Sequence, residues 1–334
     1  MAEKNEQYTE HWGREGFYGD GVNVIRAHHV PDFSQVSGPH APHRLNIGDV
    51  HVPDRSDPNA LPVPIFLSRT GAQLSVSGRE RPMPFVISNV EADEVHFIQA
   101  GEARFATAYG SITGLPGDFV FIPRAVPYRV VTETGPTLSL IVETPGALRF
   151  DAAPKFDPIN ETATVESSPP QAIETTSLVK SFDGVTRYTK PYNPLAIVSV
   201  SGGTNPVWKI NLKDIPVNEA GHPTQFAASP HNDELFYTLS ARRRRRPPMH
   251  YNADYDEMSL YFAGPGAYGA VKEPGTLTWV PKGVAHHGPT EDVAEGYLAW
   301  MLESRPTLRL TPAGQQVAQL METDLYGPHP SIQK

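Results

Sequence analysis

The chain has 334 residues, of which 39% are hydrophobic and 19% charged, a composition typical of globular proteins with room for two domains. A formal net charge of −9 argues against nucleic acid or an anionic membrane surface as the main partner. Because the sequence contains no cysteine, disulfides, zinc–thiolate sites and a thiol nucleophile are excluded, and no apolar run approaches the roughly 18 residues of a membrane span.

The first residues, MAEKNEQYTEHWG, lack the apolar stretch of a secretion signal. We therefore expect a cytoplasmic protein, in a compartment where oxygen and reduced iron are both available. Without covalent cross-links, the fold must be stabilised by packing and hydrogen bonds.

Strand-like patterns dominate the chain. Runs rich in β-branched and aromatic residues, bounded by Gly or Pro, are typical of short strands joined by turns. In chain order they are RFATAYGSI, DFVFIPRAVPYRVV, PTLSLIVE, LAIVSVSG, ELFYTLS, SLYFAG and TLTWVPKG. Only Thr311 to Met321 predicts a helix, with Thr311 as the capping residue and Pro312 in the first helical position. We expect an all-β fold with few helices.

An internal repeat relates the two halves of the chain. The matching residues are Asn89, Asp93, Glu94, Gly101, Gly117, Pro123 and Ala125 in one half, and Asn252, Asp256, Glu257, Gly264, Gly275, Pro281 and Gly283 in the other. In both halves Asn precedes Glu by five positions, Glu precedes Gly by seven, and the second Gly precedes Pro by six. We interpret the halves as two copies of one β-domain, over residues 1–160 and 161–334. Residues 151–180, poor in large apolar groups, are interpreted as a linker or surface excursion.

The second copy resembles the cupin superfamily in its two signature motifs. These are His250-x-Asn252-x4-Glu257-x6-Gly264 and Gly275-x5-Pro281-x-Gly283-x2-His286. The resemblance implies a double-stranded β-helix, or jelly roll, with a metal ion in its mouth, so two copies imply a bicupin. It departs from the pattern at Asn252, where many cupins carry a second histidine.

A comparison of the two copies indicates which of them can hold a metal. Where the second copy has His250 and His286, the first has Ile87 and Tyr128. Since the missing groups are both imidazoles, we expect the N-terminal domain to lack this metal site. In the C-terminal domain, His250, Glu257 and His286 would occupy one face of the ion and leave other positions open, as in non-haem Fe(II) oxygenases. Nitrogen-rich ligation also suits Mn(II), Ni(II) and Zn(II).

Two assignments in the ligand set remain undecided from the sequence. Asn252 is interpreted either as a weak ligand or a donor that orients Glu257, or as a turn residue that bonds its own backbone; Asn89 in the ligand-poor copy favours the latter. His286 and His287 cannot both point inward, because neighbouring strand residues face opposite sides. The cupin spacing favours His286 over His287. Asp254 and Asp256 are expected to be solvated or to lie behind the ligands.

Three further residues are candidates for catalytic roles. His222 and His231 precede the metal motif and could bind substrate or transfer a proton, although each is more often a surface histidine. Tyr261 shares the face of Glu257 by strand alternation, and we expect it to line the pocket. The five arginines from Arg242 to Arg246 are interpreted as a solvated loop or subunit contact, with a phosphate- or nucleic-acid-binding patch as the alternative.

A closer resemblance links most of residues 80–300 to the homogentisate dioxygenases. Residues 89–130 are similar to the N-terminal β-domain of that family, and HYNADYDEMSLYFAG with PGTLTWVPKGVAHHGP is similar to its iron site. The chain is shorter than is typical of the family, and neither His222 nor His231 is in register with the family's upstream catalytic histidine. The iron-bearing large subunit of two-component hydroquinone dioxygenases is a related family of similar length.

These resemblances imply an Fe(2+)-dependent enzyme of aromatic compound catabolism that cleaves the ring of a hydroquinone-type phenol with O2. The alternatives are a metal-dependent cupin of another class, such as an isomerase, a lyase or a tailoring oxygenase for a polycyclic quinone, and a non-catalytic bicupin. We expect a small aromatic substrate and a homo-oligomer, with or without a separate small subunit, and no nucleic-acid or membrane partner.

Overall fold

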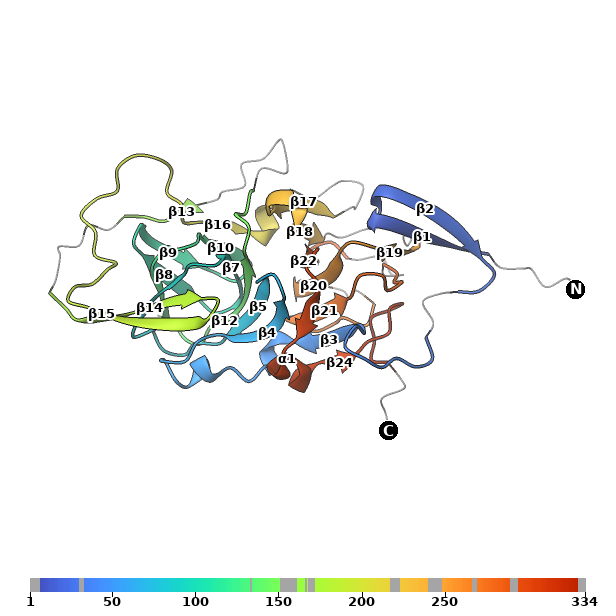
Figure 1. Cartoon of the computed structure of the whole chain (residues 1–334), viewed down its shortest axis with the longest axis horizontal. Helices are drawn as coiled ribbons and strands as arrows, with labels where there is room; N and C mark the ends of the chain where they lie inside the picture. The colour runs from blue at the N-terminus through green and yellow to red at the C-terminus, as the bar shows by residue number, and fades with distance from the viewer. Residues whose placement is uncertain are drawn as a thin grey trace, which may run out of the picture. The chain divides into compact units, whose positions relative to one another are not determined.

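The computed structural model describes residues 7–29, 33–132, 134–150, 161–165, 167, 172–216, 223–239, 248–265, 269–288 and 294–329 (Figure 1). Strands dominate these residues, and α1 (Pro312–Val317) is the one α-helix among them. Single-turn 3₁₀ helices cover Ile47–Asp49, Pro53–Arg55, Leu212–Asp214 and Pro230–Asn232. The predicted all-β fold class is therefore confirmed.

The chain divides into two compact units. Unit 1 contains residues 1–49, 217–228 and 232–334, and unit 2 contains residues 50–216 and 229–231. This division differs from the expected boundary after residue 160. The reason is a long-range strand pairing. β3 (His43–Asn46) pairs with β21 (Thr276–Val280), so an N-terminal segment belongs to the same unit as the C-terminal half.

Unit 2 is built from two sheets. In chain order its strands are β4 (Val63–Ser68), β5 (Gln73–Ser77), β6 (Val86–Asn89), β7 (Asp93–Ala100), β8 (Ala103–Thr107), β9 (Gly110–Gly114), β10 (Asp118–Ile122), β11 (Tyr128–Thr132), β12 (Leu138–Thr144), β13 (Glu161–Thr162), β14 (Thr175–Ser181), β15 (Gly184–Lys190) and β16 (Trp208–Asn211). One sheet runs β13-β16-β10-β7-β12-β5-β4 within this unit, and the other runs β15-β14-β6-β11-β8-β9.

The core of unit 2 lies between these sheets. Its buried side chains come from both of them and include Ile87, Ile98, Phe105, Ile112, Val120, Val130 and Leu178. Each fully buried side chain of this size stabilises the fold by roughly 2 kcal/mol. Because successive strand residues face opposite sides, this sandwich uses alternate positions of each strand for the core.

The prediction that residues 151–180 form a linker or surface excursion is wrong for the C-terminal end of that segment. The strand β14 pairs with β6 in parallel, and Ser177 lies opposite Val86. Leu178 belongs to the core, which explains why a segment with few large apolar residues still joins a sheet. Residues 151–160, 166 and 168–171 lie outside the described part.

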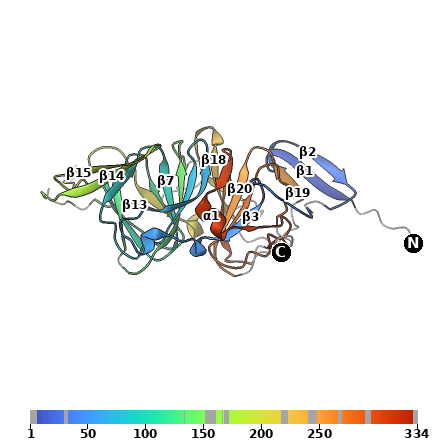
Figure 2. The same ribbon diagram turned by 60° about the horizontal axis from the view of Figure 1, so that its bottom comes forward.

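Unit 1 repeats the antiparallel pattern. In chain order its strands are β1 (Tyr8–Glu15), β2 (Tyr18–Arg26), β3, β17 (Thr224–Ala228), β18 (Glu234–Leu239), β19 (Met249–Asn252), β20 (Asp256–Ala263), β21, β22 (Leu298–Ser304), β23 (Leu308–Leu310) and β24 (Gln319–Leu320). The main sheet runs β17-β18-β22-β20-β21-β3-β24. A second sheet, β19-β1-β2, joins the N-terminal hairpin to the C-terminal half (Figures 1 and 2).

The predicted helix after Thr311 is confirmed in part. The Thr311 hydroxyl accepts a hydrogen bond from the Gly314 N–H at 3.2 Å, as an N-cap residue should, and Pro312 begins the helix. The helix ends at Val317, however, and residues 319–320 form β24, which pairs with β3. Strand pairing therefore shortens the helix that local sequence predicts.

The repeat seen in the sequence is also present in three dimensions. In unit 2 the carboxylate of Asp93 accepts hydrogen bonds from the backbone N–H groups of Arg124, at 2.8 Å, and Leu148, at 3.0 Å. Asp93 is buried at the start of β7, and it fixes the loops that follow β10 and β12. These bonds satisfy two loop donors that the sheets do not reach.

Asp256 does the same in unit 1. Its carboxylate accepts hydrogen bonds from the backbone N–H groups of Lys282, at 2.9 Å, and Leu308, at 2.7 Å. Asp256 is fully buried, so of the two positions expected for it, solvated or behind the ligands, the solvated one is wrong. Asp254 is only partly buried, which agrees better with a solvated side chain. Its carboxylate forms ion pairs with Arg14 and Arg305.

A second shared feature is the turn after each conserved proline of the repeat. The N–H of Ala125 donates to the Asn89 carbonyl at 2.6 Å, and that of Gly283 donates to the Asn252 carbonyl at 2.8 Å. Both turn residues have positive φ, 63° at Ala125 and 75° at Gly283, a conformation that glycine adopts without strain. This turn therefore has the same backbone conformation in both copies.

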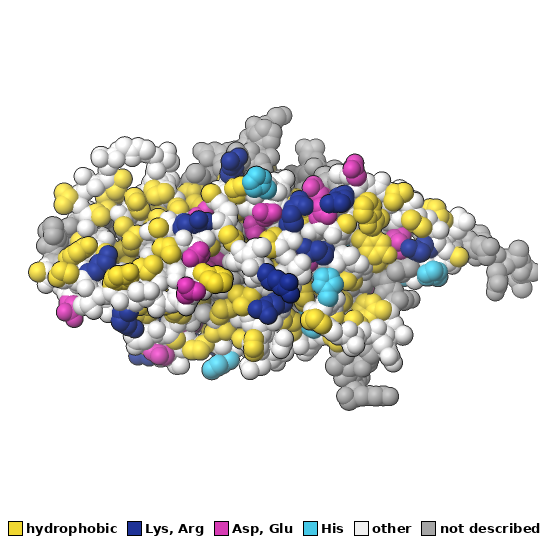
Figure 3. All heavy atoms as spheres, viewed as in Figure 1, with side chains coloured by type: hydrophobic (Ala, Val, Ile, Leu, Met, Phe, Trp, Pro, Cys, Tyr) yellow, Lys and Arg dark blue, Asp and Glu magenta, His cyan; other side chains and the backbone are white. Residues whose placement is uncertain are grey.

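Charged groups of both signs are mixed on the surface. On the face shown in Figure 3, described lysine and arginine side chains lie among aspartates and glutamates. No helix in the described part of the chain has the length and apolar character needed to cross a lipid bilayer.

The structural role of the repeated aspartate can be tested by Asp93→Ala. We expect the free energy of unfolding to fall by about 3 kcal/mol, because two loop N–H groups lose their acceptor. Urea denaturation measures this loss. The matched control, Asp183→Ala, removes an exposed carboxylate and should change stability by less than about 0.5 kcal/mol. Equal stabilities of the two variants would contradict the assigned role.

Candidate metal centre

Two backbone hydrogen bonds bring two imidazoles together. His250, on β19, and His286, after β21, form an isolated antiparallel bridge. The N–H of each residue donates to the carbonyl of the other at 3.0 Å. Their ring centroids lie 4.2 Å apart, and both side chains are buried. The bridge therefore holds both rings on one side of the fold.

Glu257 completes this group. It lies on β20, and its Oε2 is 3.3 Å from Nε2 of His286. One possible ligand atom from each of His250, Glu257 and His286 lies within 4.8 Å of the other two. The structure thus brings together the three residues that the sequence predicts as principal ligands.

The remaining ring nitrogens orient the two imidazoles. Nδ1 of His250 is 3.3 Å from the carbonyl oxygen of Pro248, and Nδ1 of His286 is 3.1 Å from that of Val284. Because a carbonyl only accepts hydrogen bonds, Nδ1 is the protonated nitrogen in each contact. Nε2 then keeps its lone pair when the ring is neutral, which is the arrangement that metal-binding histidines use.

The two imidazoles differ in their electrostatics. Burial, together with the neighbouring His286, lowers the pKa of His250 well below its usual value, so its ring is neutral at pH 7. Burial also lowers the pKa of His286, but the charge and hydrogen bond of Glu257 outweigh that effect and raise the pKa. Without a metal ion, Glu257 therefore favours the protonated form of His286.

Asn252 contacts the candidate ligands from behind. Its Nδ2 donates to Oε2 of Glu257 at 3.2 Å, which orients that carboxylate. Its Oδ1 is buried and has no hydrogen-bond partner among the described residues. Gly16 lies against this oxygen, because a Cβ on Gly16 would be 2.6 Å from it. These contacts fit an orienting role better than the interpretation of a turn residue that bonds its own backbone.

A second carboxyl group, which sequence reasoning missed, lies beside Glu257. Glu303 on β22 is directly opposite Glu257 in the strand register. Burial and the charge of Glu257 raise the pKa of Glu303 to about 8, and hydrogen bonds from Tyr237 and Asn252 offset only part of this. Glu303 is therefore mostly protonated at pH 7. Its only sequence signal is a carboxylate inside the apolar run LAWMLES.

The N-terminal hairpin provides an aromatic neighbour that sequence reasoning also missed. The strand β1 pairs in parallel with β19, and His11 lies opposite His250. The Phe17 ring lies 4.2 Å from the His250 ring and stacks on His11 at 5.3 Å. Phe17 is 45% exposed. No local pattern predicts this pairing of residues that are far apart in the sequence.

The donor set fits a divalent transition-metal ion. Two imidazole nitrogens and one carboxylate from three separate elements match the facial triad of non-haem Fe(II) proteins. The nitrogens are oriented by backbone carbonyls, and the carboxylate by the Asn252 amide. Such supporting contacts are the usual companions of metal ligands.

The other candidate residues lie elsewhere. Tyr261 is buried, donates from its hydroxyl to the Gly264 carbonyl at 2.7 Å, and stacks on Tyr297, so its hydroxyl is used in the core. His231 is exposed and belongs to unit 2. His222 and the run Arg242 to Arg246 lie outside the described residues.

His287 also points away from this group. It is only half-buried, and its ring lies 5.1 Å from that of His29. The structure therefore places His286, and not His287, with His250 and Glu257.

Unit 2 has a polar network at the corresponding position. Tyr128 lies opposite Ile87, as His286 lies opposite His250. The Tyr128 hydroxyl donates to Oε2 of Glu94 at 2.6 Å, and Nε2 of His96 lies 3.2 Å from the same oxygen. Burial raises the pKa of Glu94, but His96 and the other partners outweigh it and hold the pKa at about 2.

The same network contains a lysine. Nζ of Lys180 donates to both carboxylate oxygens of Glu143, at 2.6 and 2.5 Å. Asn89 donates to Glu94 at 3.0 Å and to Glu143 at 2.8 Å, so it bridges the two acids. An ammonium group therefore balances the buried acids of unit 2, whereas the candidate metal groups among the described residues all lie in unit 1.

Sequence comparison finds relatives named homogentisate 1,2-dioxygenase. The chain is 25% identical over 280 residues to a homogentisate 1,2-dioxygenase of Bradyrhizobium diazoefficiens, covering 70% of this chain and 60% of that protein. The predicted resemblance is confirmed. A homogentisate 1,2-dioxygenase of Rhodopseudomonas palustris is 27% identical over 269 residues, which are 67% of this chain and 58% of that protein. The chain thus matches about 60% of the length of these relatives, and no family model matches it.

Solved structures with a similar arrangement include a cupin 2 conserved barrel domain protein from Leptotrichia buccalis. The TM-score is 0.48 at 11% identity, over 84% of this chain and all of that one. Oxalate decarboxylase from Bacillus subtilis gives a TM-score of 0.42 at 12% identity, over 82% of this chain and 78% of that one.

The role of the lysine in unit 2 can be tested by Lys180→Met. We expect the unfolding free energy at pH 8 to fall by about 3 kcal/mol, because the buried Glu143 carboxylate loses its cation. Without Lys180, the folded state raises the pKa of Glu143 further above that of the unfolded chain, so the loss should shrink as the pH falls toward 5. Urea denaturation at both pH values measures this.

The exposed Lys213 gives the matched control, Lys213→Met, which should cost less than about 0.5 kcal/mol at either pH. A loss that is the same for both lysine variants, or the same at both pH values, would show that Lys180 does not balance these acids.

Proposed function

We propose that the chain is a non-haem Fe(II)-dependent dioxygenase that cleaves the ring of a hydroquinone-type phenol, such as homogentisate or hydroquinone, with O2. The convergence of His250, Glu257 and His286 carries the proposal. The similarity to proteins named homogentisate 1,2-dioxygenase supports the reaction class. A facial triad alone would suit several metal-dependent reactions.

In this proposal His250, Glu257 and His286 hold the iron. When bound, Fe(II) supplies open positions for O2 and a phenolic oxygen and a path for electrons between them. The protein's part is to hold the ligands in place. The carbonyls of Pro248 and Val284 fix the imidazoles, and Asn252 fixes the carboxylate.

The charge of the site also suits a divalent cation. Burial and the charge of Glu257 raise the pKa of Glu303 to about 8, so Glu303 is mostly neutral at pH 7 and adds little negative charge beside the triad. A divalent ion held there would keep more of its positive charge, which would favour binding of an anionic phenolate. Phe17, half-exposed beside His250, is placed to pack against the substrate ring.

Location and assembly follow the same proposal. We place the enzyme in the cytoplasm, where reduced iron and oxygen meet. We also propose that the enzyme acts as a homo-oligomer, with or without a separate small subunit.

The test compares the two equivalent positions of the repeat, His286 and Tyr128. Protein reconstituted with Fe(II) without oxygen is mixed with homogentisate, gentisate or hydroquinone, and O2 uptake and bound iron are measured. We expect His286→Ala to lower iron content and O2 uptake by at least about 100-fold, since it removes a ligand. The matched control, Tyr128→Phe, should retain both within about threefold, because it removes only a hydroxyl in unit 2.

Two outcomes would contradict the proposal. If His286→Ala retains iron as the wild type does, the triad does not hold the metal. If the wild type binds iron at the triad but consumes no O2 with any of these phenols, the alternative of a metal-dependent cupin of another class replaces it.

A further inference from the structure

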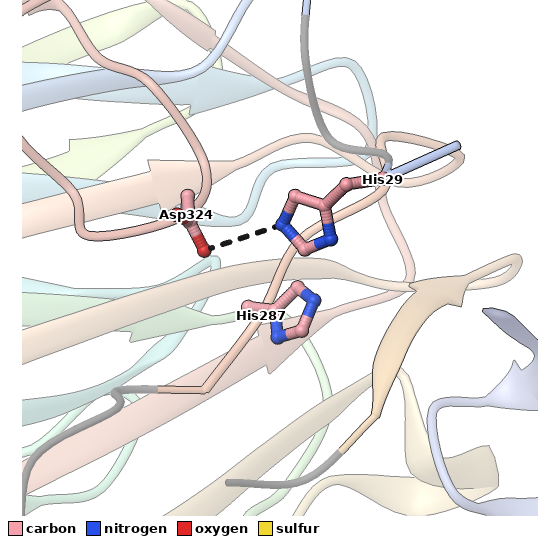
Figure 4. A group of neighbouring side chains, drawn as sticks. All are labelled: His29, His287 and Asp324. Carbon is pink, nitrogen blue, oxygen red and sulfur yellow. Dashed lines mark ion pairs between the residues drawn. The ribbon is translucent and has the colours of Figure 1, made fainter. Parts of the chain in front are cut away.

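A second group of potential ligands lies outside the triad. It consists of His29, His287 and Asp324, which we call the His29 cluster (Figure 4). One ligand atom from each lies within 4.8 Å of the other two, and all three residues are half-buried. They come from three parts of unit 1: the segment after β2, the segment after β21 and a C-terminal loop.

The loop that carries Asp324 is held by a single carboxylate. Glu322 accepts hydrogen bonds from the backbone N–H groups of Asp324, at 2.7 Å, of Leu325, at 2.9 Å, and of Gly327. Three donors on one side chain fix the turn of the loop. Asp324 therefore projects from a pre-organised backbone.

The same loop is fastened to His287. The backbone N–H of His287 donates to the Thr323 carbonyl at 3.0 Å, and its carbonyl accepts a bond from the Tyr326 hydroxyl at 2.6 Å. The Thr323 hydroxyl also donates to the Ala285 carbonyl at 2.8 Å. His287 and Asp324 are thus held at a fixed separation by backbone contacts that do not involve their side chains.

His29 closes the cluster from the N-terminal segment. Its ring lies 5.1 Å from that of His287 and 5.1 Å from that of Tyr8. Nε2 of His29 is 3.9 Å from Oδ1 of Asp324, which is too long for a hydrogen bond. Two ligand atoms on one Zn²⁺ ion, each about 2.1 Å from the metal, lie roughly 3 to 4 Å apart. The observed separation matches such a bridged pair.

We propose that the His29 cluster is a second divalent-cation site, with Zn²⁺ as the preferred ion and His29, His287 and Asp324 as ligands. Two imidazoles and one carboxylate leave a fourth tetrahedral position for water. The ion would tie the N-terminal segment to the C-terminal loop beside His286, the neighbour of His287. The inference does not depend on the proposed dioxygenase reaction.

The experiment separates the two sites by removing one at a time. Chelator-treated protein is titrated with Zn²⁺ by calorimetry, and the bound metal is counted by mass spectrometry after gel filtration. We expect the wild type to bind two equivalents, one of them at the triad. His250→Ala should bind one equivalent, and the double variant His250→Ala/Asp324→Asn should bind none above background.

Single variants and a neighbouring histidine provide the controls. Asp324→Asn and His29→Gln should each weaken the second equivalent by at least about 10-fold, since each removes a ligand. His28→Ala, which removes an exposed histidine one position away, should leave both equivalents unchanged. Thermal melting in chelator verifies that the variants fold as the wild type does.

The inference is overturned if His250→Ala and His250→Ala/Asp324→Asn bind Zn²⁺ equally. It is also overturned if His250→Ala binds none. Neither result tests the triad. The triad would be shown not to bind Zn²⁺ if His250→Ala bound as many equivalents of Zn²⁺ as the wild type.

Discussion

The site depends on one short backbone contact, the bridge between His250 and His286. Two hydrogen bonds of 3.0 Å join residues that are 36 positions apart in the sequence, and they place both imidazoles beside Glu257. Each supporting contact acts on this arrangement, whether a carbonyl that fixes a ring or the Asn252 amide that fixes the carboxylate. A bridge of this kind lets the sheet orient the ligands before any ion binds, which lowers the entropic cost of binding.

The two copies of the domain show what the scaffold needs and what the metal adds. Both retain a buried aspartate that fixes loops, an asparagine that contacts an acid, and a glutamate on the following strand. In unit 2 Lys180 balances the charge of the paired acids, and the Tyr128 hydroxyl donates a hydrogen bond to Glu94. In unit 1 two histidines stand near the equivalent acids, and no lysine is paired with Glu257 or Glu303 by the ion pairs described. The same fold thus accommodates buried negative charge in two ways. Unit 2 uses a lysine side chain, and unit 1 has a site suited to a bound metal ion.

The triad could be proposed from sequence because His250, Glu257 and His286 stand at the offsets of the two cupin motifs, and strand alternation favours His286 over His287. Sequence did not predict features that depend on long-range pairing. Phe17 reaches His250 only because β1 pairs with β19, and Glu303 meets Glu257 only through the register of β20 with β22. The pairing of β3 with β21, which places an early strand in unit 1, is of the same kind. Local patterns carry no information on which distant strands become neighbours.

The most direct test of the central claim is anomalous diffraction at the iron absorption edge from crystals reconstituted with Fe(II). The account predicts a strong peak in unit 1 between Nε2 of His250, Nε2 of His286 and the carboxylate of Glu257, with ligand distances near 2.1 Å. An iron peak elsewhere, with these three side chains contacting only solvent and one another, would contradict it.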